Sequence, residues 1–174
     1  MLLIERFAEG GGDAAEVLEL PFDARCRSRL RTRVVSGEEC GLFLERGTVL
    51  RGGDRLLAND GRIVAVAAAA ESLMEASTDD RAGAALLIAR AAYHLGNRHV
   101  AVQLMPGRLR FVADHVLGDM VRGLGLSLIA LSAPFEPEGG AYGSHAHGGH
   151  AHPHGHSSEG EGRGPRIHDG FTYK

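Results

Sequence analysis

The chain has 174 residues, enough for one medium domain or two small ones, and its lack of tryptophan favours small cores of Ala, Val and Leu. The formal net charge is -3 with both signs mixed along the chain, so electrostatics give no reason to expect a nucleic-acid partner. There is no signal-peptide pattern, no apolar stretch long enough to cross a membrane, and no CxxC spacing between Cys26 and Cys40. We therefore expect a cytoplasmic protein with free thiols that binds ions or other proteins.

Residues 17–66 predict a small all-β unit. Short apolar runs separated by turn signals predict strands at residues 17–20, 30–35, 41–44, 55–57 and 62–66. Asn59-Asp60-Gly61 predicts a hairpin with a type I′ turn, because these residues tolerate the positive φ angles that this turn requires. Arg29, Arg31 and Arg33 alternate with less polar residues, which places a basic row on one face of a strand. We interpret this row as a solvated face, with a docking surface for an acidic partner as the alternative.

The following part of the chain predicts the element order β-α-β-β-α-β, which is the ferredoxin-like pattern. The expected elements are a strand over 71–77, a helix over 80–95, strands over 99–105 and 108–112, a helix over 115–124 and a strand over 126–131. Asp80 suits the positive end of the first helix, and Gly96-Asn97 suits its C-terminal stop. Asp114 is the expected N-cap of the second helix, which ends at Gly125.

Beyond Pro134 the composition changes to Pro, Glu, Gly, Ser and His, which cannot form a core. The expected fold class is α+β. We predict an all-β N-terminal domain over residues 1–73, a ferredoxin-like domain over 74–142 and a His-rich C-terminal tail over 143–174 that is disordered without metal.

The tail contains six of the ten histidines of the chain: His145, His147, His150, His152, His154 and His156. Several are two residues apart, so in an extended chain their imidazoles project to one side and can converge on one cation. Neutral imidazole favours Ni, Cu and Zn over Ca and Mg. The alternative is an expression tag or a low-complexity tail, but the histidines are spaced and unrelated sequence follows them.

His99 is the first residue of the strand expected over 99–105, and alternation places it on the face opposite Val100 and Val102. If the helices cover the valine face, His99 points outward, where a lone histidine is usually an ordinary surface residue. Two chains related by a two-fold axis would however each present His99 to the same point and could build a shared metal site by symmetry.

Several separated motifs then identify a resemblance. In the second half they are Gly96-Asn97-Arg98-His99 with Gln103, Asp114-His115-Val116-Leu117 with Met120, and the run over residues 134–142. In the first half they are Arg46-Gly47, Leu50, Gly53-Asp54 and Asp60-Gly61. Together, and in this order, they resemble the UreE family of urease accessory proteins over nearly the whole chain up to the tail.

The resemblance implies a cytoplasmic, homodimeric nickel metallochaperone with a β-rich peptide-binding N-terminal domain and a ferredoxin-like metal-binding domain. It would deliver Ni(II) to the urease apoprotein with an accessory GTPase as partner. His99 matches the histidine of the family's Gly-Asn-Arg-His motif and would bind one nickel ion jointly with the same residue of a second subunit. The histidines at 145–156 would complete the coordination or hold further ions. Cu(II) or Zn(II) would compete in vitro, since divalent affinity rises through nickel to copper.

The remaining histidines are weaker candidates. Some relatives form a peripheral metal site from the histidine of the Asp-His-Val-Leu motif and one just before it, but this chain has Val112-Ala113 there, so His115 is only a possible ligand. His94, one turn before the expected helix end, is interpreted as a capping or packing group. We assign no role to His168.

Two other functions compete with a nickel carrier. The sequence has no HExxH, no paired Cys ligands, no Gly-rich phosphate loop and no GxSxG, so we expect no enzymatic activity. A nickel storage or buffering protein without directed transfer is the alternative that the histidines leave open. A metal sensor would also need a DNA-binding element, and the sequence contains no recognisable one.

Overall fold

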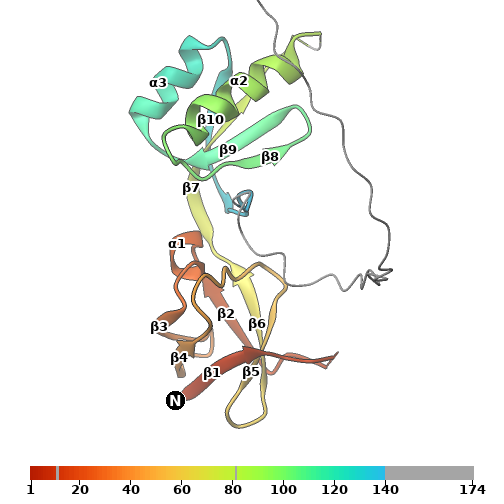
Figure 1. Cartoon of the computed structure of the whole chain (residues 1–174), viewed down its shortest axis with the longest axis vertical. Helices are drawn as coiled ribbons and strands as arrows, with labels where there is room; N and C mark the ends of the chain where they lie inside the picture. Colours follow the sequence, from red (N-terminus) through yellow and green to blue (C-terminus); the bar gives the residue numbers. More distant parts are fainter. Residues whose placement is uncertain (11, 81, 140–174) are drawn as a thin grey trace, which may run out of the picture. The chain divides into compact units, whose positions relative to one another are not determined.

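The computed structural model describes residues 1–10, 12–80 and 82–139 (Figure 1). The predicted α+β class is confirmed, with a six-stranded sheet in the first half and a four-stranded sheet with two longer helices in the second. The predicted disordered tail, its six histidines and His168 lie outside the described residues. In the described part of the chain, no helix combines the length and apolar character needed to cross a membrane. Both cysteines are free thiols, as predicted.

The N-terminal sheet has the strand order β2-β6-β5-β1-β4-β3. Its elements are β1 (Leu2–Phe7), β2 (Glu16–Leu20), α1 (Phe22–Arg25), β3 (Arg29–Arg33), β4 (Glu39–Phe43), β5 (Arg55–Ala58) and β6 (Ile63–Ala68). The five predicted strands are all present, but β1 and the single-turn helix α1 were not predicted. Strand β1 lies in the middle of the sheet because the side chains of Leu2 and Ile4 are fully buried in its core.

The hairpin predicted between β5 and β6 is confirmed, but its turn is not of type I′. Gly61 N donates to Ala58 O at 3.0 Å, and Ala58 N donates to Arg62 O at 2.9 Å. Gly61 has a φ of +88°, whereas Asn59 and Asp60 have no positive φ, and a type I′ turn requires positive φ at both central residues. Asn59 is held instead by the neighbouring strand, since its N–H donates to Leu3 O at 2.8 Å and its side chain accepts from Leu3 N at 3.0 Å.

The second sheet has the order β10-β7-β9-β8, and each neighbouring pair is antiparallel. Its elements are β7 (Ala70–Ser77), α2 (Ala84–Gly96), β8 (Gln103–Met105), β9 (Arg108–Val112), α3 (His115–Gly123) and β10 (Ser127–Pro134). This order of elements confirms the predicted ferredoxin-like pattern. Helices α2 and α3 pack on one face of the sheet (Figure 1), where Leu95 and Val121 meet Phe111 in a common core.

The helix ends follow the predicted signals, with one shift. Asp114 caps α3, since its Oδ1 accepts from Leu117 N at 2.9 Å. Helix α2 ends at Gly96 as expected but begins at Ala84 instead of residue 80. Asp80 Oδ1 accepts from the N–H groups of Ala82 at 3.0 Å and Gly83 at 3.1 Å, so the acidic residue stabilises a turn before the helix and not its first turn.

The strand predicted over 99–105 is shorter than expected. Only Gln103–Met105 forms β8, and residues 97–99 form a turn. Val100 and Val102 pack against the core as predicted, but Leu104 is 46% exposed. The strict alternation that placed His99 on a strand face therefore does not apply, and the position of His99 is set by the end of α2.

Candidate metal-binding site

His99 closes the C-terminus of helix α2. Val100 N donates to Leu95 O at 3.1 Å, and His99 N donates to Gly96 O at 2.9 Å. These two bonds form a Schellman motif in which His99 holds the left-handed position that usually belongs to glycine. Its φ is +57°, and it is the only non-glycine residue with a positive φ in the part of the chain that the structure describes.

The left-handed backbone makes His99 a strained residue. This conformation costs about 1–2 kcal/mol for an L-residue, because Cβ crowds the following carbonyl oxygen. Leu95 and Val100, the residues whose backbones are bonded across the motif, both pack in the C-terminal core and hold the turn in place. Strain of this kind in an exposed residue is an indication of function, since a glycine would fill the position at a lower cost.

Two further side chains at this helix end, His94 and Arg98, contact other groups of the helix. The ring of His94 lies edge-on to the ring of Tyr93, with 5.4 Å between their centroids, which agrees with the packing role expected for His94. Arg98 Nη1 donates to His94 O at 3.0 Å and so caps a carbonyl of the last turn.

Of the predicted ligands, the structure describes only His99 and His115. His115 is exposed at the first position of α3, directly after its cap Asp114. Among residues 1–10, 12–80 and 82–139, no group of three or more His, Cys, Asp or Glu side chains is placed to hold a metal ion. The predicted ligands at 145–156 lie outside the described residues. His99 therefore belongs to no cluster of three ligands within the described residues, and a complete coordination sphere needs ligands from the rest of the chain or from a second chain.

A second polar cluster, which the sequence analysis did not predict, surrounds Arg25. Its guanidinium is fully buried and donates to the carbonyl oxygens of Leu20, Leu50 and Phe135. Arg25 Nη1 also donates to Glu136 Oε1 at 2.9 Å. Nothing in the sequence indicated that Arg25 is buried, because residues 21–24 before it show neither helical nor strand periodicity. Glu136 appeared only within the motif over 134–142.

Glu136 completes this cluster with its carboxylate. It accepts from Gly52 N at 2.7 Å and from Arg51 Nη1 at 3.3 Å in addition to Arg25. Burial raises the pKa of Glu136, but the Gly52 N–H and the Arg25 guanidinium outweigh it and hold the pKa below its ordinary value of 4.5. The carboxylate is therefore charged at neutral pH. We call Arg25, Arg51, Gly52 and Glu136 the Arg25 cluster.

The Arg25 cluster is connected to the chain that follows His99. Glu136 N donates to Gln103 Oε1 at 3.3 Å, and Glu138 N donates to Val102 O at 2.8 Å. Phe135 is buried beside this segment and packs edge-on against Phe22, with 5.9 Å between the ring centroids. Residues 135–138 thus bond both to the N-terminal domain and to the stretch that leads from His99 into β8.

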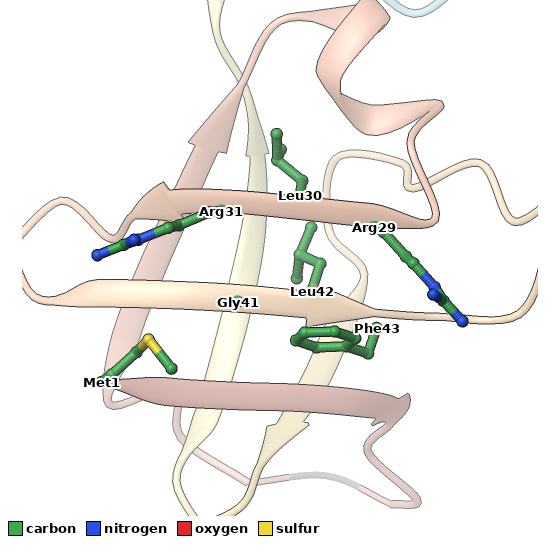
Figure 2. A pocket seen from close by; sticks show the side chains of 7 residues that line it. All are labelled: Met1, Arg29, Leu30, Arg31, Gly41, Leu42 and Phe43. Atoms are coloured by element: carbon green, nitrogen blue, oxygen red, sulfur yellow. The ribbon is translucent and has the colours of Figure 1, made fainter.

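A shallow pocket of about 440 Å³ lies over strands β3 and β4 (Figure 2). It is lined by Met1, Arg29, Leu30, Arg31, Gly41, Leu42 and Phe43. Gly41 leaves the floor of the pocket without a side chain, and Phe43 beside it is 48% exposed. The predicted basic row is confirmed on an exposed face, where Arg31 and Arg33 both form ion pairs with Glu39 at 3.0 and 2.9 Å.

Fold and site together define a class: an α+β protein in which a small β domain precedes a ferredoxin-like domain that exposes a strained histidine at a helix end. Residues 5–69 match the family model of the UreE urease accessory protein N-terminal domain, and residues 71–160 match that of its C-terminal domain. The chain belongs to the UreE family of urease accessory proteins, as the sequence motifs indicated.

Curated relatives agree with this assignment. The Urease accessory protein UreE of Dechloromonas aromatica (strain RCB) is 55% identical over 141 residues, which is 78% of this chain and 78% of the relative. The protein of the same name from Pseudomonas putida (strain GB-1) is 50% identical over 150 residues, covering 85% of this chain and 88% of the relative. That of Alkalilimnicola ehrlichii is 48% identical over 143 residues, covering 82% and 85%.

Proposed function

We propose that the protein is a nickel metallochaperone that donates Ni(II) during assembly of the urease metallocentre. Membership of a family of urease accessory proteins supports a role in urease maturation. The observation that carries the proposal is His99, an exposed imidazole on a strained left-handed turn where glycine would fit better. In this proposal the protein is not an enzyme and acts in the cytoplasm, with urease apoprotein and an accessory GTPase as partners.

The proposed nickel site is shared between two chains. His99 would bind the ion together with His99 of the partner subunit, because a two-fold axis brings identical residues to one point. Histidines at 145–156 would supply further ligands, and tethering raises their local concentration at the site. His115 is a weaker candidate, since it lies exposed without a second described ligand. A site with few fixed ligands releases its nickel ion easily, as a carrier requires.

The chemistry of imidazole sets the conditions under which cargo is held. Each imidazole must be neutral to bind metal, so nickel affinity should fall at acidic pH. Divalent affinity rises from nickel to copper and falls again to zinc, so Cu(II) should displace nickel in vitro, whereas Zn(II) should bind the same ligands without displacing it as effectively. Selectivity for nickel would then come from metal availability and from the partner proteins.

Nickel titration of the full chain by calorimetry tests the shared site. We expect one tightly bound ion per two chains, lost in His99→Ala, with the control His115→Ala retaining it. Light scattering on the same samples should give a dimer mass for all three proteins. Retention of the tight site in His99→Ala would contradict the proposal.

A transfer assay separates a carrier from a storage protein. The nickel-loaded protein is added to apo-urease with its accessory proteins, and urease activity is compared with that obtained from the same amount of nickel held by His99→Ala. A carrier should activate urease faster than this variant, which keeps the histidines at 145–156. Equal rates would favour nickel storage or buffering, the alternative that these histidines support.

A further inference from the structure

Strand β3 has one free edge. It lies at the end of the N-terminal sheet and pairs with β4. Leu44 N donates to Ser28 O at 2.7 Å and Val34 N donates to Glu38 O at 3.0 Å, both in the register of this ladder. Hydrogen-bonded and non-bonded pairs alternate in an antiparallel ladder, so the even-numbered residues bond to β4. The backbone groups of the odd-numbered residues, Arg29, Arg31 and Arg33, therefore point to the free edge.

This edge is open between Arg29 and Arg33. At its far end Val35 N donates to Val17 O at 2.8 Å, which closes the edge there. No hydrogen bond from the described parts of the chain reaches the outward backbone N–H and C=O groups of the three arginines. An unpaired row of such groups is a template for one more strand, and binding by strand addition uses it.

The side chains along this edge give it a positive charge. All three arginines are exposed on one face, and Glu39 is the acid paired with two of them. Arg29 forms no ion pair with a described residue, so the face keeps an excess of positive charge. The pocket beside it adds apolar surface from Phe43, whose ring lies next to the buried Gly41 (Figure 2). This combination fits a partner that is extended, acidic and partly apolar.

We propose that the β3 edge binds an extended acidic segment of a partner protein by strand addition. Carboxylates at alternate positions of that segment lie opposite Arg29, Arg31 and Arg33, where cross-strand Cβ atoms are about 5 Å apart. Its backbone bonds to the outward groups of the same residues. The proposed function enters here only through the assumption that the partner is a protein. The charge and the extended backbone of that partner are what the β3 edge recognises.

Fluorescence anisotropy with a labelled synthetic peptide of alternating Glu and Val tests the proposal, with the full chain in nickel-free buffer at low salt. Arg31→Ala should weaken binding severalfold, and Arg31→Pro should weaken it roughly tenfold more. Proline removes the outward N–H without removing a bond to β4, and edge strands tolerate it at such positions. Arg29→Glu should weaken binding more than Arg31→Ala does, whereas Arg55→Glu, the same charge reversal on strand β5, should leave it unchanged. A peptide of alternating Lys and Val should not bind.

Three outcomes would overturn the proposal. One is failure of the acidic peptide to bind the unmodified chain, in which case the arginines only prevent edge-to-edge aggregation. Another is equal affinity of Arg29→Glu and Arg55→Glu, a comparison that stands even if Arg31→Pro fails to fold. The last is self-association through β3 that Arg31→Pro abolishes, since the occupant would then be a second copy. His99→Ala should bind the peptide normally, so failure here is distinguishable from failure of the nickel site.

Discussion

Arg25 and His99 are both polar residues held by helix-end and loop backbones, but their surroundings are opposite. Arg25 is fully buried, and its guanidinium donates to three carbonyl oxygens and one carboxylate. His99 is exposed, takes a left-handed backbone conformation, and has no cluster of metal-binding side chains around it in the described part of the chain.

The difference separates a structural from a functional polar residue. A buried charge is tolerated only when its hydrogen bonds are satisfied, and Arg25 satisfies this condition by joining segments far apart in the sequence. His99 adds strain, and its imidazole has no such partners among the described residues, so these surroundings do not explain why a histidine stands there. Arg25 should thus matter for stability and His99 for binding, and the following variants test that division.

Arg25→Met should have the largest effect. The variant keeps most of the side-chain volume but removes the donor that Arg25 supplies to the carbonyls of Leu50 and Phe135 and to Glu136, which should reduce the free energy of unfolding by about 3–5 kcal/mol. Urea unfolding followed by circular dichroism measures the loss. The matched control is Arg27→Met, which removes an exposed ion pair with Asp23 and should cost less than about 1 kcal/mol. Similar losses in both variants would contradict a structural role for Arg25.

Glu136→Gln should have the next largest effect. It removes the charge that accepts from Gly52 N and Arg25 while preserving shape, so we expect a loss of about 1–3 kcal/mol in the same unfolding experiment. Glu138→Gln is the control, because this exposed residue lies two positions along the same segment and contributes its backbone N–H to Val102 O. Hydrogen exchange at Gly52 should accelerate in Glu136→Gln alone.

His99→Gly should separate stability from binding. Glycine adopts positive φ without the Cβ clash, so the variant should be more stable than the parent by about 1 kcal/mol, while His99→Ala keeps the strain and gains nothing. Both variants should lose the tight nickel site in calorimetry. A destabilised His99→Gly would show that the imidazole makes a structural contribution, and the contrast with Arg25 would fail.

The smallest effect is a pH dependence of the Arg25 cluster. The pKa of Glu136 is lowered in the folded state, so its stabilisation is present above the ordinary value of 4.5 and is lost as the pH falls through the lower folded value. The stability difference between the parent and Glu136→Gln should therefore be constant near neutral pH and shrink below about pH 4.5. Denaturant midpoints of the two proteins across this range measure it. If the stability difference between the two proteins stays constant at acidic pH, the charge of Glu136 is not the cause of that difference.

The sequence predicted most of the elements because their signals are local. The cap at Asp114, the stop at Gly96 and the order of the second domain needed only periodicity and turn residues. Predictions failed where a contact distant in sequence overrode the local signal. Asn59 is held by Leu3 instead of forming the type I′ turn, and β1, which was not predicted, is an interior strand because it pairs with both β4 and β5.

For the candidate site, the sequence identified His99 and its motif, but not the reason for its exposure. Alternation in the sequence placed His99 on a strand. The structure places it in a turn, because Gly96 O accepts from His99 N and Leu95 O accepts from Val100 N. Arg25 and Glu136 are 111 residues apart, and no periodicity within a short window can detect such a pair.

By itself, the sequence determined the α+β class, the ferredoxin-like order, the family and the histidine to examine first, since these depend on local patterns and short motifs. Tertiary structure alone decided that Arg25 is a buried satisfied cation, that the backbone of His99 is left-handed, and that the edge of β3 is open between Arg29 and Arg33. Each of these depends on which distant backbone groups come within hydrogen-bonding distance, a condition that only the folded chain fixes.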